Sequence, residues 1–165
     1  MNTGGARSNQ FRIFCAIPGI ANGGQVAATK IQFMAKGGTI PSADIADIPV
    51  MYRGREVHFA GERTFQPWTI SIYNDNEFTV RSAFENWVNA ISKADSTNGI
   101  MQPSIYQAQL EVHQLDRSDQ TMQRYRFHDA YPINVSEIQL AWEANNQIQE
   151  FNVTFAYNYW LNLGK

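Results

Sequence analysis

Acidic and basic side chains lie close together between residues 53 and 68, in the stretch RGREVHFAGERTFQPW. Glu56 and Glu62 could in principle act as a general acid and a general base, since a pair of carboxyl groups can divide these roles. Three arginines lie within the same stretch, so ion pairing is the simpler interpretation. The stretch is therefore either a catalytic cleft or a surface that another protein chain covers.

The histidines and the cysteine match no reactive pattern. His58, His113 and His128 lie far apart in the sequence, and none belongs to a metal-binding motif such as HExxH. Cys15 is the only cysteine, which excludes an internal disulfide and a cysteine-based zinc cluster within the chain. No GxSxG or GxGxxG motif occurs. We expect no catalytic site, no cofactor and no metal, with solvated or hydrogen-bonded strand histidines and a buried thiol.

The charge balance argues against tight binding to nucleic acid. The chain has 13 basic and 15 acidic residues, a net charge of −2, and no cluster of basic residues in its sequence. Proteins that hold nucleic acid neutralise phosphates with lysine and arginine, and residues 128–163 contain neither. Four aromatic residues could stack bases, but packing of a helix on a sheet is the better account of them: Phe65, Trp68, Phe84 and Trp87.

A sugar-binding β-sandwich is a harder alternative to exclude from composition. Its exposed aromatic residues would be Trp142, Tyr157, Tyr159 and Trp160. The chain length is that of a single domain. The first ten residues are expected to be a flexible arm. They lack the apolar segment of a secretory signal, so we expect folding in the cytoplasm.

Alternation of apolar and polar residues predicts antiparallel strands along most of the chain. The expected strands are residues 11–17, 29–36, 68–73, 105–115, 121–130, 137–142 and 148–161. The glycine-rich residues 18–28 are expected to be a loop, Pro132 to interrupt the sheet, and Asn145-Asn146 to form a turn.

Residues 48–61 predict a protruding hairpin, and residues 76–92 predict the one helix. Arg53-Gly54 separates two short β-prone runs, Gly54 can supply the positive φ of a tight turn, and Gly61 is expected to end the second arm.

Asn74 and Asp75 are suitable N-cap residues for the helix. Its apolar stripe consists of Val80, Phe84, Trp87, Val88 and Ile91. The expected fold is mainly β, an antiparallel sandwich or barrel with one helix, whose long strands leave edges that need partners.

Two blocks of sequence carry a more specific pattern. The first is DIPVMYRGREVHFAGERTFQPWTISIYNDN with the helix FTVRSAFENWVNAI, and the second is YPINVSEIQLAWEANNQIQEFNVTFAYNYW. In residue types, order and spacing, these blocks resemble the tail tube proteins of contractile-tailed bacteriophages, the T-even type in particular. The type VI secretion tube protein and the tubes of pyocin-like particles are similar in fold.

The resemblance implies a structural protein made of a single tail tube domain over residues 1–165. Subunits of that family form hexameric rings that stack into a tube inside a contractile sheath, and each lends four strands to one closed barrel. The implied partners are other copies of the chain, the sheath, baseplate and terminator proteins, and DNA that passes through the lumen without tight binding. The implied location is the virion. A phage-derived secretion or bacteriocin particle is the alternative.

The resemblance also implies roles for named residues. The charged residues expected at contacts between subunits or rings are Arg53, Arg55, Glu56, Glu62 and Arg63. The residues expected to anchor the hairpin loop or fill the core are Gly61, Phe65, Trp68, Phe84, Trp87 and Trp142. The face expected to line a neutral or acidic lumen consists of Gln107, Gln109, Glu111 and His113.

Overall fold

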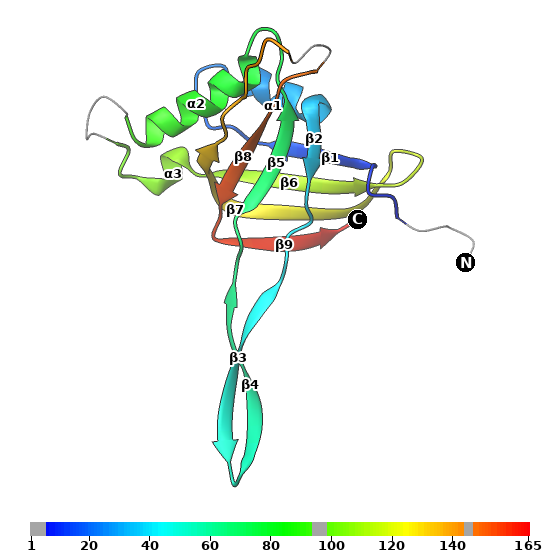
Figure 1. The fold of residues 1–165 in the computed structure, drawn as a ribbon, viewed down its shortest axis with the longest axis vertical. Coiled ribbons are helices and arrows are strands. Elements are labelled where there is room, and N and C mark those ends of the chain that lie inside the picture. The colour runs from blue at the N-terminus through cyan, green and yellow to red at the C-terminus, as the bar shows by residue number, and fades with distance from the viewer. Residues whose placement is uncertain (1–5, 94–98, 144–146) are drawn as a thin grey trace.

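Figure 1 shows the computed structural model, which describes residues 6–93, 99–143 and 147–165. Every strand pairing in this part of the chain is antiparallel, which confirms the expected mainly-β antiparallel class. The elements are β1 (Phe11–Cys15), α1 (Gly24–Met34), β2 (Ala35–Gly38), β3 (Asp44–Tyr52), β4 (Arg55–Thr64), β5 (Trp68–Tyr73), α2 (Thr79–Ile91), α3 (Pro103–Tyr106), β6 (Ala108–Leu115), β7 (Thr121–Val135), β8 (Glu150–Ala156) and β9 (Tyr159–Gly164).

The 15-residue strand β7 belongs to two layers. Its first part pairs with β6 and β9, which gives the strand order β1-β6-β7-β9, and its last part pairs with β8, which gives β7-β8-β5-β2. In Figure 1 the strands of the first layer lie one above another, and β2, β5 and β8 run across them. Pro132 does not interrupt β7 as expected. It lies at a register shift, where an irregular ladder tolerates a residue without an N–H.

The core fills the space between the two layers and is closed by α1 and α2. Trp68 from β5 stacks on Phe127 from β7, with ring centroids 4.4 Å apart, and Phe84 from α2 meets Phe155 from β8 at 5.8 Å. Trp87 is fully buried and donates its indole N–H to the carbonyl of Tyr106, 2.8 Å away. The aromatic residues of α2 therefore bind the helix to both the sheet and the chain that precedes β6.

The expected strand at residues 29–36 is wrong as far as Met34, because residues 24–34 form the helix α1, which also replaces the end of the loop expected at residues 18–28. Residues 35–36 do belong to a strand, β2. A further unexpected helix, α3, includes the first two residues of the strand expected at residues 105–115. Ile31 and Phe33 alternate with polar residues and so imitate a strand, but Ile31 is fully buried whereas Phe33 is 80% exposed. The residues that α1 buries are Gly24, Ala27 and Ile31, which is helical spacing.

Two other expectations fail towards the C-terminus. Residues 137–142 form no strand, and the last expected strand divides at Tyr157 and Asn158 into β8 and β9, which pair on different parts of β7. The expected turn at residues 145–146 lies outside the described residues. At the other end, the side chain of Gln114 donates to the carbonyls of Arg7 and Gln10, so residues 7–10 of the expected arm are attached to β6.

The segment before α2 is fixed to α1 by Lys30. The Lys30 ammonium group contacts Asp75 at 2.8 Å and Glu77 at 3.0 Å. The hydrogen bonds that Lys30 donates to these carboxylates raise the pKa of Lys30. Burial alone would raise the pKa of Asp75, but the hydrogen bond and charge of Lys30 lower it overall, and they lower the pKa of Glu77 as well. The residue at the N-cap is Phe78, with φ 54°, so Asn74 and Asp75 do not cap α2 as expected.

We predict that Lys30→Met reduces stability in a pH-dependent way. The stabilisation by Asp75 and Glu77 is present above their ordinary pKa values of 3.8 and 4.5 and is lost as the pH falls through their lower folded values. The stabilisation by Lys30 is present below 10.5 and is lost as the pH rises through its higher folded value. Urea unfolding should therefore show the largest difference from the unaltered chain near neutral pH. The exposed Lys93→Met is the control, and a difference that stays constant into acid would contradict the prediction.

Candidate assembly surfaces

The histidines and the cysteine each have separate surroundings in the described residues. They contain no group of three or more metal-ligating His, Cys, Asp or Glu side chains. His58 pairs with Asp47, His113 pairs with Glu111, and His128 stacks on Tyr159. Burial raises the pKa of the Cys15 thiol far above its ordinary value, so the thiol stays protonated. None of the helices in the described ranges has the length and apolar character needed to span a membrane.

The strand edges at the ends of the first layer are open. Within the described residues, no strand lies beyond β1 on one side or beyond β9 on the other. The carbonyl of Gln10 accepts from Leu115 and the N–H of Ala16 donates to Gln109. Since neighbouring residues of a strand direct their backbone groups to opposite sides, the groups of Phe11, Ile13 and Cys15 are directed away from β6. The Cys15 carbonyl accepts from the N–H of Ile17, whereas the groups of Phe11 have no strand partner within the described residues. Donors and acceptors without a strand partner are templates for another strand.

One face of the layer β1-β6-β7-β9 is apolar and lies in the core, and the other is polar. Leu110 and Val112 of β6 are on the buried face, so Gln109, Glu111 and His113 are on the opposite face, as expected. Gln107 precedes β6, and its backbone N–H donates to the carbonyl of Pro103 instead. The structure thus brings three of the four expected lumen residues together.

The polar face is more basic than the sequence indicated. The strand register places Arg12 opposite His113, His113 opposite Arg124, and Glu111 opposite Arg126. Glu111 accepts from His113 and from Arg126, each at 2.7 Å. Partial burial would raise the pKa of Glu111, but these two hydrogen bonds lower it overall. Three arginines and one glutamate share this face, so it is more basic than the neutral or acidic lining expected from the sequence.

The hairpin of β3 and β4 projects away from both layers, beyond β9 (Figure 1). The turn residues Arg53 and Gly54 have φ of 48° and 78°, as the expected tight turn requires. The cross-strand pairs Ile48–Phe59 and Val50–Val57 share one face, and all four side chains are exposed. A two-stranded hairpin with an exposed apolar face is marginally stable in water, so we expect another surface to cover it.

Apart from the pair of His58 and Asp47, the charged residues of the hairpin form no ion pair with one another within the described residues. Within the described residues, the ion pairs include none of Arg53, Arg55, Glu56 and Glu62. The simple interpretation of ion pairing inside this stretch is therefore wrong, and these four charges are available to a neighbour. Arg63 differs, because its guanidinium group lies over the rings of Phe65 and Trp160, 5.2 and 4.8 Å from the ring centres.

Gly61 does not end the second arm, because β4 continues to Thr64. It lies opposite Ala46 in a bulge of the ladder. A Cβ atom at this position would lie 3.0 Å from the carbonyl oxygen of Ala46, so the close approach of the two strands favours glycine here. Phe65, expected to anchor the loop against the helix, packs its ring edge-on against Tyr157, which is not in a helix, with centroids 6.0 Å apart.

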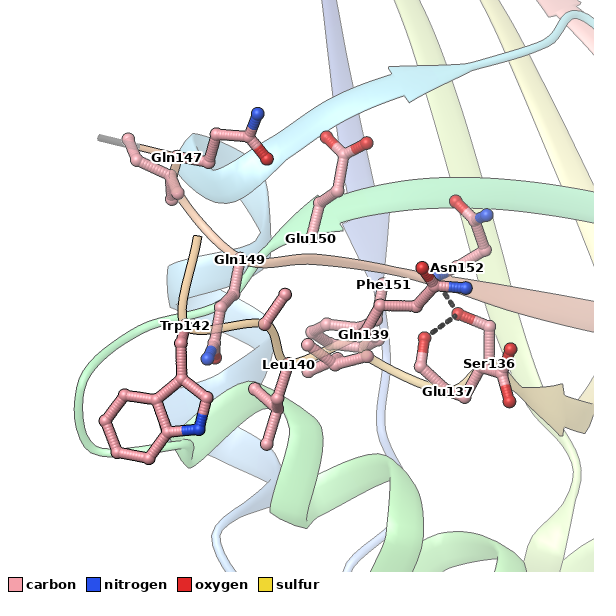
Figure 2. Close-up of a pocket in the computed structure, with 13 residues that line it drawn as sticks. Ser136, Glu137, Gln139, Leu140, Trp142, Gln147, Gln149, Glu150, Phe151 and Asn152 are labelled. Carbon is pink, nitrogen blue, oxygen red and sulfur yellow. Dashed lines mark hydrogen bonds between the residues drawn. The ribbon is translucent and has the colours of Figure 1, made fainter. Parts of the chain in front are cut away.

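Trp142 is fully exposed and contributes nothing to the core of this chain. It lies in an open pocket formed by residues 136–142 and 147–152, and Figure 2 shows its indole pointing away from the other lining residues. Trp142 is also separate from Trp160, which contacts Arg63. The aromatic residues of the sugar-binding alternative therefore do not form one platform.

These features define a structural protein with two kinds of surface that lack a partner within the described residues. They are the strand edges of the layer β1-β6-β7-β9 and the apolar face of the hairpin. A sequence model described as phage tail tube protein matches residues 6–163, and the chain belongs to that family. It is 34% identical over 131 residues to the tail tube protein gp19 of Enterobacteria phage T4, which covers 78% of this chain and 79% of that one. It is 23% identical over 159 residues to the tail tube protein of Serratia phage KSP90, which covers 95% and 89%. The protein is thus a tail tube protein of contractile phage tails.

Solved structures share the fold at low sequence identity. A chain from the sheath/tube terminator of the PVC extracellular contractile injection system aligns with a TM-score of 0.72 and 9% identity, over 99% of this chain and 100% of that one. A chain from the baseplate of the anti-feeding prophage aligns with a TM-score of 0.68 and 14% identity, over 98% and 97%. These neighbours support the fold, and the curated relatives support the family.

We predict that Val50→Gln weakens assembly while Met51→Gln does not. Val50 lies on the apolar face of the hairpin and the adjacent Met51 lies on the opposite face, and both are exposed. Neither substitution should change the free energy of unfolding by more than about 0.5 kcal/mol. Sedimentation of tubes should show a critical concentration several-fold higher for Val50→Gln alone. Equal behaviour of the two variants would show that the apolar face is not covered on assembly.

Proposed function

We propose that six copies of this chain close into a ring, in which β9 of one copy pairs with β1 of the next, and that rings stack into the inner tube of the tail. The observation that carries the proposal is the four-stranded layer β1-β6-β7-β9, which is open at both ends. Head-to-tail pairing of two different edges generates a ring when the rotation between copies closes. Self-assembly, without catalysis, would be the activity of the protein.

The size of such a ring suits a channel. Six layers of four strands give about 24 strands at a spacing of about 4.8 Å, and a tilt of about 40° then gives a backbone diameter of about 40–50 Å. Side chains on the inner face reduce this width but leave space for a DNA duplex. We infer that the tube conducts the genome on ejection, with a sheath outside it and baseplate and terminator proteins at its ends. Assembly would take place in the host cytoplasm.

A phage tail is favoured over a phage-derived injection particle. The curated phage relative is 34% identical to this chain, whereas the aligned chains of injection particles are 9–14% identical. Both kinds of particle would use the same edges and the same hairpin. The difference would lie in the cargo, which the polar face of the layer would meet in the lumen.

We predict that the purified chain forms rings or tubes in negative-stain electron microscopy and that Phe11→Pro prevents this. The N–H of Phe11 is directed away from β6, and proline is tolerated at the first residue of a strand. Proline therefore removes a donor from the open edge without breaking the ladder inside the chain. Phe11→Ala is the control, since it also removes the aromatic ring of Phe11 but keeps the backbone N–H. Tubes from Phe11→Pro would contradict pairing at β1, and monomers of the unaltered chain at high concentration would contradict the whole proposal.

We predict that Gln109→Lys slows DNA delivery by phage particles without changing the number of assembled tails. Gln109 is exposed on the polar face, and an added cation there would attract passing phosphates. Glu111 is unsuitable for this test because its carboxylate accepts hydrogen bonds from His113 and Arg126. Gln25→Lys adds the same charge on α1, where delivery should be unaffected. Normal delivery by Gln109→Lys, measured as the rate of genome release, would show that this face does not line the channel.

A further inference from the structure

A single indole lies between the body of the protein and both arms of the hairpin. Trp160 of β9 donates its Nε1–H to the carbonyl of Ser42, 3.0 Å away, and Ser42 lies just before β3. The guanidinium carbon of Arg63, close to the end of β4, lies 4.8 Å from the centre of an indole ring of the same residue. The two arms therefore meet one side chain at the base of the hairpin.

The hairpin makes few other contacts with the two sheet layers. Its strands pair only with each other within the described residues, and the contact between His58 and Asp47 is internal to it. Beyond Trp160, Arg63 also lies over Phe65, which in turn packs against Tyr157. The direction in which the hairpin projects is consequently set at its base, by the contacts made there by Arg63 and Ser42.

Trp160 is itself held firmly and lies on an open edge. Its backbone pairs with Phe127, whose ring is fully buried against Trp68, and its indole packs edge-on against Tyr125. The strand that carries it, β9, has no partner on its far side within the described residues. The hairpin extends beyond β9 in the direction in which the strands of this layer succeed one another (Figure 1). A copy that pairs with β9 thus arrives beside the hairpin.

We propose that Trp160 is a positioning residue for assembly: it fixes the hairpin in the direction in which it meets the copy that pairs with β9. This inference rests on the proposed function, since the ligand is a second copy of the chain. A hairpin that is already aligned loses less conformational freedom on binding, which favours association. Because Trp160 is part of β9, edge pairing and hairpin docking depend on the same residue.

The test measures the hairpin in the dilute, unassembled chain. Spin labels are attached at Glu56→Cys in the hairpin and Asn89→Cys on α2, both exposed, while the buried Cys15 is left unlabelled. Pulsed electron resonance should give one narrow distance distribution for the otherwise unaltered chain. Trp160→Ala and Arg63→Gln should each broaden it. Trp160→Phe, which keeps a ring but loses the donor to Ser42, should broaden it less. Trp142→Ala, an exposed tryptophan outside the hairpin base, should leave it unchanged.

The second measurement is the critical concentration of tube formation for the same variants without labels. We expect a several-fold increase for Trp160→Ala and Arg63→Gln and none for Trp142→Ala. Arg63→Gln leaves the sequence of β9 intact, so it stays informative if Trp160→Ala fails to fold. Narrow distributions in both Arg63→Gln and Trp160→Phe would overturn the positioning role, and broad distributions with unchanged assembly would overturn its coupling to assembly. If the unaltered chain forms no tubes, the proposed function fails, while the distances still decide whether Trp160 orients the hairpin.

Discussion

Backbone hydrogen bonding at the margins of the layer β1-β6-β7-β9 is the constraint on which the rest of this structure depends. Inside the layer, neighbouring strands satisfy each other's backbone hydrogen bonds. At the outer edges, β1 and β9 each have backbone donors and acceptors without a strand partner in the described residues. Soluble proteins normally cover or interrupt such edges. In the proposed assembly, an identical molecule would supply the missing partner at both edges.

The remainder of the fold keeps these edges rigid and in place. The long strand β7 joins the two layers, so the open layer is stabilised by the core residues Phe127, Trp68 and Phe155 and by the helix that carries Phe84 and Trp87. The hairpin is the opposite case, since it has almost no core of its own and exposes an apolar face. Its direction depends on a few contacts at its base, chiefly those of Trp160.

Expectations from the sequence held where local chemistry decides the structure. The Arg53-Gly54 turn, the helix α2 and the alternation in β6 all follow from residues that are close together in the chain. They failed where distant residues decide. Residues 29–36 alternate like a strand, but Ile31 is buried in the core as part of a helix. Lys30 forms an ion pair with Asp75, which lies far along the chain. Trp142 matched the family pattern, and yet it is exposed in the isolated chain.

The sequence by itself determined the mainly-β class, the family, the absence of a recognisable catalytic motif, and the hairpin with its tight turn, because these depend on periodicity, turn residues and residue types. Only the tertiary structure decided which strands lie at the open edges and which arginines share the face with Glu111. Arg12, Arg124 and Arg126 come together through strand register, and Arg63 meets Trp160 across almost a hundred residues of chain. Contacts of that kind arise from pairing between distant strands, which no local pattern records.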